Sequence, residues 1–402
     1  MRIDELLNNC PVLHVTGDPA VDISSIAYDS RNCTKSSLFV AVQGLKTDGH
    51  EYIDQAAARG AIAVVYERDL PLLPAGMTAI RVENSRRALG ILGRNYYHDP
   101  SSQLFLVGVT GTKGKTTVTY LLESIFQKAG LSAGVLGTVN YRFGGKIMPA
   151  SNTTPESIEM QKMLRLMVDE GVTHVVAEVS SHAVDLRRID DCAFDIGVFT
   201  NLAQDHLDYH LTLENYYQVK RRFFTEVIPE GGKKQQPQRI INADDAWGKR
   251  LIDELDSGSL TYGIDSPCHV RAEKYDLAID AIRADIASPW GGLHVMSGLT
   301  GKFNLYNILA AVASALSFGI EPEAVQEGVK ALSSVPGRLE KVKTGIDAEP
   351  MVFVDYAHTE DALRKVLESL RHFKEGKIIT VFGCGGDRDR GKGPSWVPPS
   401  RN

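Results

Sequence analysis

The feature that most constrains this chain is an apolar run followed at once by a glycine-rich loop and a helical stretch. Residues 104–109 read LFLVGV, and residues 110–117 read TGTKGKTT. Apolar residues then recur at three- and four-residue spacing from Val118 to Phe126. A short run that is apolar throughout is typical of a parallel strand buried on both faces. The order strand, loop, helix therefore predicts an α/β domain built on a parallel sheet.

The loop has the composition of a phosphate-binding loop. Its glycines let backbone N–H groups approach phosphate oxygens, and the N-terminus of the following helix adds partial positive charge. Lys115 can reach the β- and γ-phosphates, and the hydroxyl of Thr116 or Thr117 can bind Mg²⁺. The alternative is a structural glycine turn with an incidental lysine. The predicted nucleotide-binding residues are Gly111, Thr112, Lys113, Gly114, Lys115, Thr116 and Thr117.

Two further polar residues stand near the ends of predicted strands. Glu178 lies at the end of the run 173–179, and His206 follows the run 196–202. Ligands of open α/β sheets gather at the carboxyl ends of strands, where a carboxylate and an imidazole could hold a divalent ion. Each residue alone is equally well explained as a helix cap or a hydrogen-bonded loop residue. Lys220 lies in a helical, basic stretch whose periodicity alone indicates a solvated face.

Composition narrows the class of protein. The 402 residues contain 44 Lys+Arg and 50 Asp+Glu, a net charge of −6, which argues against a nucleic-acid partner. No run approaches the roughly 18 apolar residues of a membrane span, and the N-terminus lacks the form of a signal peptide. The five cysteines are scattered and form no CxxC pair. We therefore expect a cytoplasmic chain with reduced thiols and no membrane partner.

Nine ordered sequence blocks resemble the Mur ligase family. They are GTKGKTT (111–117), NTTP (152–155), EVSSH (178–182), NLAQDHLDYH (201–210), YYQVKRRFF (216–224), GKFNLYNILAA (301–311), PGRLE (336–340), VDYAHT (354–359) and FGCGGDRDRGK (382–392). The resemblance implies an α/β, three-domain architecture. Breaks near Pro100 and Pro336 place a UDP-MurNAc-binding domain at 1–103, a central P-loop parallel-sheet ATPase domain at 104–336 and a partial Rossmann-like domain at 337–402.

The resemblance also implies roles for individual residues. The uridine diphosphate pocket would be lined by Ser30, Leu45, Lys46 and Thr47. The muramoyl-dipeptide would be held by Asn152, Thr153, Thr154, Ser180 and Arg188. The residues near the nucleotide would be Asn304, Arg338, Asp355 and His358. The incoming amino acid would contact Arg388.

Lys220 occupies the position of the family's carbamylated lysine. Carbon dioxide adds to the neutral amine and converts a cation into a carboxylate, so that N6-carboxylysine can help to bind Mg²⁺. The implied metal ligands are Thr116, Glu178, His206 and carbamylated Lys220. The implied catalytic residues are Lys115, Lys220, Glu178 and His206.

The implied reaction is ATP-driven amide formation, with ATP and Mg²⁺ as cofactors. A monomeric enzyme would join meso-diaminopimelate to UDP-MurNAc-L-Ala-D-Glu through an acyl phosphate, in the synthesis of the peptidoglycan precursor. Three alternatives are L-lysine as the acceptor, a non-catalytic remnant that binds the UDP-linked dipeptide, and a P-loop NTPase that drives motion. The last leaves the NTTP, EVSSH and lysine blocks without an explanation.

The end of the sequence departs from the family pattern. Family members carry roughly a hundred further residues, including an Asp-Asn-Pro-Arg block that grips diaminopimelate. Residues 393–402, GPSWVPPSRN, have no periodicity and follow Gly391-Lys392, after which relatives continue Arg-Pro-Leu-Met-Gly. We therefore expect a C-terminally truncated chain whose last ten or so residues are out of frame.

Overall fold

The structure, a computed structural model, divides into two compact units. Unit 1 comprises Met1–Thr110, Leu131–Val198 and Tyr217–Arg239. Unit 2 comprises Gly111–Gly130, Phe199–Tyr216 and Ile240–Asn402. The residues described are 1–45, 47–69, 72–231, 236–255, 258–342, 351–357, 360–371, 373 and 376–383. Within these ranges, no helix combines the length and the apolar character needed to cross a membrane.

Unit 1 begins with a five-stranded sheet of order β1-β5-β4-β3-β2. Its strands are β1 (Val12–Thr16), β2 (Ser25–Ala27), β3 (Ser37–Val40), β4 (Ala61–Tyr66) and β5 (Thr78–Val82). Its helices are α1 (Ile3–Leu6), η1 (Ser30–Asn32), η2 (Gly49–Tyr52), α2 (Ile53–Ala58) and α3 (Ser85–Tyr96). All pairings are parallel except β1 with β5. The side chains of β3 and β4 pack into two separate apolar clusters, as expected for strands covered on both faces.

A second sheet of unit 1 has the order β11-β6-β10-β7-β8-β9. Its strands are β6 (Phe105–Thr110), β7 (Ala133–Leu136), β8 (Asn140–Phe143), β9 (Lys146–Pro149), β10 (His174–Glu178) and β11 (Ile196–Phe199). The pairs of β10 with β6 and β7 are parallel, whereas β8 and β9 form an antiparallel edge. The buried strands predicted near 104–109, 173–179 and 196–202 are thus confirmed as β6, β10 and β11.

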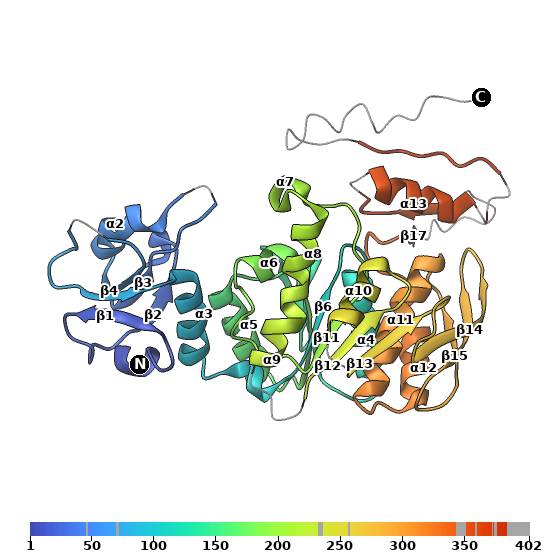
Figure 1. Ribbon diagram of the computed structural model, residues 1–402, viewed down its shortest axis with the longest axis horizontal. Coiled ribbons are helices and arrows are strands. Elements are labelled where there is room, and N and C mark those ends of the chain that lie inside the picture. The colour runs from blue at the N-terminus through green and yellow to red at the C-terminus, as the bar shows by residue number, and fades with distance from the viewer. Residues whose placement is uncertain are drawn as a thin grey trace. The chain divides into compact units, whose positions relative to one another are not determined.

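Helix α3 runs beside helix α5 in unit 1 (Figure 1). Helix α5 spans Ser157–Asp169. Gly93 permits the close approach, because a Cβ there would lie 3.1 Å from Ile158 Cδ1. The remaining helical segments that lie wholly in unit 1 are η3 (Pro100–Gln103), α6 (Ser181–Asp185), the π-helical η4 (Phe223–Val227) and α9 (Ile228–Glu230).

Unit 2 is built around three packed helices. They are α4 (Lys115–Lys128), α11 (Lys302–Ser317) and α12 (Pro322–Ala331). Helix α4 packs on both others, and Gly328 of α12 lies directly against the Ile125 backbone, where any Cβ would collide. The other elements assigned here are α7 (Leu207–His210), α8 (Leu213–Arg222), whose later residues belong to unit 1, α10 (Ala246–Glu254) and α13 (Glu360–Arg371).

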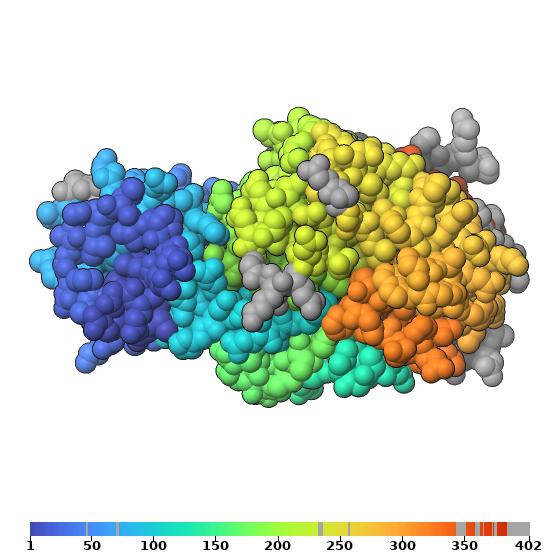
Figure 2. Space-filling view, turned by 60° about the horizontal axis from the view of Figure 1, so that its bottom comes forward, coloured from blue at the N-terminus to red at the C-terminus, as the bar shows by residue number. Residues whose placement is uncertain are grey.

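The strands of unit 2 run β16-β15-β14-β13-β12, with a separate β17-β18 pair. They are β12 (Gln238–Asn242), β13 (Ser259–Gly263), β14 (Val270–Leu277), β15 (Ile282–Ala287), β16 (Leu293–Ser297), β17 (Glu340–Val342) and β18 (Val352–Val354). Strands β14 to β16 are antiparallel, and β16 packs beside α12 on the face seen in Figure 2. The α/β class is confirmed, with both parallel and antiparallel pairings.

One predicted strand is wrong. Residues 377–382 read KIITVF, an apolar run whose pattern predicts a buried strand, but they are not a strand in the structure, and Ile379 and Val381 are 86% and 93% exposed. Among the described residues no strand pairs with it, and an apolar run becomes a strand only where a neighbour accepts its backbone hydrogen bonds. The expected frame change after Lys392 lies outside the described residues.

Asp244 anchors the loop after β13 and gives a prediction about stability. Burial alone would raise the pKa of its carboxyl, but N–H donors of Asp265, Ile264 and Ser266 outweigh burial and lower the pKa to about 2. A lowered pKa contributes stability above the unfolded-state pKa near 3.8, and this contribution is lost as the pH falls towards 2.

Asp244→Asn is therefore expected to flatten the decline in the free energy of unfolding between pH 4 and pH 2. The carboxyl is only half-buried, so the difference should be on the order of 1 kcal/mol. Urea unfolding at a series of pH values measures it. A parallel decline in both proteins would contradict the prediction. Asp280→Asn, in an exposed turn, is the control.

Candidate active site

The glycine loop of unit 2 has the backbone geometry that its sequence requires. Gly111 and Gly114 have φ of +142° and +93°, which L side chains rarely adopt. A Cβ at Gly111 would collide with Thr200 Oγ1, and one at Gly114 with Asn307 Oδ1. Gly114 is the residue before α4, so the loop leads directly into a helix N-terminus. The predicted order strand, loop, helix is confirmed.

A strand-end segment of unit 2 holds the loop in place. The Asn201 side chain accepts from the Lys113 N–H at 3.0 Å and donates to the Lys113 carbonyl at 3.0 Å. Thr200 Oγ1 donates to the same carbonyl at 2.7 Å. The Thr112 hydroxyl accepts from the Ala203 N–H at 3.0 Å. These contacts fix the loop without using Lys115 or Thr117.

Lys115 lies over its own loop. Its Nζ donates to the carbonyls of Gly111 at 2.8 Å and Thr112 at 3.2 Å. Thr116 and Thr117 are each 4% exposed, and the Thr116 hydroxyl accepts from Arg338 Nη2 at 3.2 Å. The structure thus brings a guanidinium, an ammonium and a hydroxyl to one loop, a combination suited to phosphate oxygens.

His206 is exposed and directly precedes the short helix α7, with a left-handed backbone, φ +54°. Its ring lies edge-on to Tyr216, with 6.2 Å between the ring centroids. Burial raises the pKa of Tyr216, whose hydroxyl meets Thr112 at 3.3 Å. Nearby, Lys113 pairs with Asp205 at 3.4 Å. His206 therefore belongs to the segment that holds the glycine loop.

The other predicted nucleotide contacts of unit 2 differ in setting. Asn304 is 1% exposed and hydrogen-bonds to the Thr300 carbonyl, just before α11, and to the Asn307 side chain in α11. Asp355 accepts from the N–H groups of Leu339 and Ala357. It thereby holds the segment that carries Arg338. His358 lies outside the described residues.

In unit 1, Glu178 ends β10 and is 1% exposed. Its two carboxylate oxygens accept from the N–H and the hydroxyl of Thr138, each at 2.9 Å. The Thr138 hydroxyl also meets Thr153 Oγ1 at 3.1 Å. Gly137 makes room for the carboxylate, because a Cβ there would lie 2.6 Å from Glu178 Oε1. Glu178 and Thr153 are thus brought together through a residue that the sequence interpretation missed.

Three of the predicted dipeptide-binding residues, Thr154, Ser180 and Arg188, form one network in unit 1. Thr154 Oγ1 donates to the Glu178 carbonyl at 2.6 Å and lies 3.3 Å from Ser180 Oγ. Arg188 Nη1 donates to the Thr154 carbonyl at 3.2 Å. Asn152 is exposed, and its carbonyl accepts from the Tyr141 hydroxyl.

Lys220 is buried, 1% exposed, so the interpretation as a solvated basic face is wrong for this residue. Its Nζ donates to Thr110 Oγ1 at 3.3 Å, and that hydroxyl donates to the Val179 carbonyl at 2.8 Å. Thr110 ends β6, and Val179 directly follows Glu178. Lys220 therefore reaches the carboxyl end of the sheet, where Glu178 also lies.

The described residues of the predicted uridine pocket lie in η1 and in the turn after β3. Ser30 is buried and donates to Gln55 Oε1 at 2.6 Å. Leu45 and Thr47 are exposed beside a turn in which the Gly44 N–H bonds the Thr47 carbonyl. Lys46 and Arg388 lie outside the described residues. Among the described residues, Ser30 makes no hydrogen bond with a residue of this turn.

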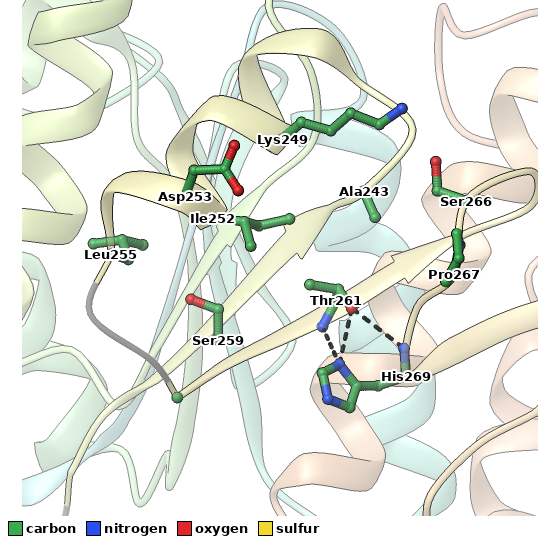
Figure 3. A pocket seen from close by; sticks show the side chains of 11 residues that line it. Ala243, Lys249, Ile252, Asp253, Leu255, Ser259, Thr261, Ser266, Pro267 and His269 are labelled. Carbon is green, nitrogen blue, oxygen red and sulfur yellow. Dashed lines mark hydrogen bonds between the residues drawn. The ribbon is translucent and has the colours of Figure 1, made fainter.

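An open hollow of roughly 520 Å³ lies elsewhere in unit 2, between α10, β13 and the loop before β14 (Figure 3). His269 Nδ1 lies within hydrogen-bond distance of the N–H and hydroxyl of Thr261, at 3.1 Å and 2.8 Å. None of the predicted site residues lines this hollow. We therefore do not assign it to the active site.

Several residues of the site were missed from the sequence. Thr110 ends β6, and Thr138 and Asn201 each lie two residues after a strand, so the rule that ligands gather at carboxyl ends of strands could have found them. Asn307 carries no such signal, because it lies within α11.

Three family models match the chain. Residues 22–97 match "Mur ligase family, catalytic domain", residues 109–315 "Mur ligase middle domain" and residues 337–397 "Mur ligase, glutamate ligase domain". Over 394 residues the chain is 45% identical to the UDP-N-acetylmuramoyl-L-alanyl-D-glutamate--2,6-diaminopimelate ligase of Geobacter metallireducens, covering 98% of this chain and 76% of that protein.

The enzyme of the same name from Geobacter sulfurreducens is 46% identical, covering 98% of this chain and 77% of that protein. A solved structure, also titled UDP-N-acetylmuramoyl-L-alanyl-D-glutamate--2,6-diaminopimelate ligase, superposes with a TM-score of 0.80 at 30% identity. That superposition covers 98% of this chain and 79% of the other.

Proposed function

This chain belongs to the Mur ligase family, and from that premise we propose that it is an ATP-dependent ligase that joins meso-diaminopimelate to UDP-MurNAc-L-Ala-D-Glu. The observation that carries the proposal is 45–46% identity, over 98% of the chain, to relatives named for this reaction. A cytoplasmic location agrees with a substrate activated by UDP and with the use of ATP.

The glycine loop supports the ATP half of the proposal. Backbone N–H groups at the start of α4 can bind phosphate oxygens, and Lys115 and Arg338 add positive charge beside them. The carboxylate of the D-glutamyl residue would attack the γ-phosphorus, and ADP would leave. The amine of the amino acid would then attack the acyl carbon, and phosphate would leave. Lys115 would offset charge on the transferring phosphoryl group.

We propose that Mg²⁺ is held by Glu178, His206, the Thr116 hydroxyl and carbamylated Lys220. Carboxylate and hydroxyl oxygens suit this hard cation. A carbamate on Lys220 would supply a second carboxylate in addition to that of Glu178. Bound Mg²⁺ would neutralise phosphate charge.

For the other substrate, we propose that Asn152, Thr153, Thr154, Ser180 and Arg188 hold the dipeptide. The Thr154–Ser180–Arg188 network supports this, because hydroxyl and guanidinium groups suit carboxylate oxygens.

The uridine diphosphate would be bound by Ser30, Leu45, Lys46 and Thr47. Residues 1–103, 104–336 and 337–402 would be the three domains, with Arg388 contacting the amino acid.

Mass spectrometry of the reaction products tests the proposal. The protein is incubated with ATP, Mg²⁺, bicarbonate and UDP-MurNAc-L-Ala-D-Glu, with diaminopimelate or L-lysine in separate tubes. A tripeptide formed with diaminopimelate supports the proposal, and one formed only with lysine contradicts the acceptor. Absence of product in both tubes, with binding of the UDP-linked dipeptide, would indicate the non-catalytic alternative.

A further inference from the structure

Three charged side chains of unit 1 converge where α5 begins. Glu156, directly before α5, places Oε2 3.2 Å from Arg188 Nε and Oε1 3.9 Å from Arg86 Nη1. The side chains of Glu156, Arg188 and Arg86 are only 14%, 15% and 20% exposed. One carboxylate thus lies between two guanidiniums that belong to different segments of the chain, α3 and the loop after α6.

The contacts continue on both sides of this carboxylate. Arg86 Nη2 donates at 2.8 Å to the carbonyl of Gln43, the residue before the turn proposed to bind uridine diphosphate. Arg188 Nη1 donates at 3.2 Å to the carbonyl of Thr154, which we propose holds the dipeptide. Glu156 is therefore the central residue in a series of polar contacts. The series connects the segment proposed to bind the nucleotide end of the substrate with the segment proposed to bind its peptide end.

The strength of these contacts depends on the charge of Glu156. The N–H of Arg188 Nε is buried and is not aligned on a hydrogen-bond acceptor among the described residues, so its contact with Glu156 is an ion pair. A guanidinium that loses its counter-charge in a mostly dry setting is costly to keep in place. Without the negative charge of Glu156, the Arg188 side chain could rotate towards water and would no longer be held in one orientation.

A second contact ties the same turn of α5 to the first sheet of unit 1. The Tyr28 hydroxyl lies beside the carboxyl of Glu159, whose pKa is raised by burial. Tyr28 follows β2, two residues before Ser30. The first turn of α5 thus faces the N-terminal segment at a second place besides Arg86.

We propose that Glu156 is a positioning residue for the UDP-linked dipeptide: it holds Arg188 and Arg86 in one register, so that the nucleotide end and the peptide end of the ligand are bound together. This rests on the proposed function, since it takes the ligand class from it. Glu156 acts through Arg188 and does not itself touch the reacting atoms.

Isothermal titration calorimetry of the full chain tests this with two ligands, UDP-MurNAc-L-Ala-D-Glu and UDP-MurNAc, which lacks the peptide. Glu156→Gln keeps the size of the side chain and removes its charge. The variant is expected to raise the Kd for the dipeptide ligand about tenfold, the effect of losing one mostly buried ion pair. The Kd for UDP-MurNAc should stay within about twofold. Glu156→Asp should regain part of the loss.

Steady-state kinetics give a second measurement. Glu156→Gln should raise KM for the dipeptide substrate about tenfold and leave kcat and KM for ATP within about twofold. The matched control is Glu170→Gln, at the other end of α5, where an exposed carboxylate pairs with Lys146. The control should bind both ligands as the wild type does.

A double-mutant cycle separates positioning from folding. Arg86→Gln should weaken dipeptide binding by a smaller factor than Glu156→Gln does. The double variant should bind the dipeptide ligand as weakly as Glu156→Gln alone. If Glu156→Gln does not fold, Arg86→Gln tests the inference in its place. Unchanged dipeptide binding in both variants, or equal loss of both ligands, would overturn the inference while the wild type still binds. A wild type that binds neither ligand would instead overturn the proposed function and this inference with it.

Discussion

Replacing Lys115 with methionine is expected to lower kcat for tripeptide formation by about 10³-fold, because this side chain places a positive charge over the glycine loop. Its Nζ already lies over the loop, 2.8 Å from the Gly111 carbonyl. Methionine has a similar length and no charge, so the loop should keep its shape. Release of ADP and formation of tripeptide are measured together at saturating ATP.

The control for this variant is Lys128→Met. Lys128 is in the last turn of the same helix, α4, and is exposed. The Lys128→Met protein should form the tripeptide at the wild-type rate. Binding of UDP-MurNAc-L-Ala-D-Glu should be unchanged in both variants, because the proposed dipeptide residues belong to unit 1. If Lys115→Met retains activity within about tenfold of wild type, the phosphate-binding role of this lysine is wrong.

The glycine loop could be predicted because its constraints are local. Gly111 and Gly114 adopt left-handed backbones that favour glycine, and the apolar strand β6 and helix α4 flank them in the order that the sequence shows. Glu178 was also placed correctly at a strand end, since a run of buried apolar residues leading to one carboxylate is a strong pattern.

What could not be predicted depends on contacts distant in sequence. Asn201 and Lys113 are 88 residues apart, and Glu156 is linked to Arg86 and Arg188 from two other segments. In the sequence, Glu156 is only an acidic residue before a helix, which a capping role explains equally well. The run 377–382 fails for the same reason, because a strand needs a partner that the local pattern does not specify.

The helical periodicity around Lys220 predicted the wrong environment for this side chain. The basic stretch indicated an exposed face, yet Lys220 is 1% exposed while Arg221 and Arg222 are partly exposed. The carbamylation that we propose would add carbon dioxide to the neutral amine of this buried lysine, beside the Thr110 hydroxyl. That step forms an N–C bond, releases a proton and leaves a carboxylate.

Lys220→Arg is therefore expected to lower ligation about 10²-fold or more, although it keeps the positive charge, because a guanidinium does not form the carbamate. Wild-type activity should fall in buffer stripped of carbon dioxide and return with bicarbonate. The variant should not respond to bicarbonate. Carbon-13 NMR with labelled bicarbonate should show a carbamate resonance only in the wild type.

Lys162→Arg, on the exposed side of α5, is the matched control and should behave as the wild type in all three measurements. Two results would separate the carbamate from a purely steric effect. A Lys220→Arg protein that ligates at the wild-type rate would show that no modification is needed. A wild type indifferent to bicarbonate, with an inactive variant, would show that Lys220 acts as a cation, through its contact with Thr110.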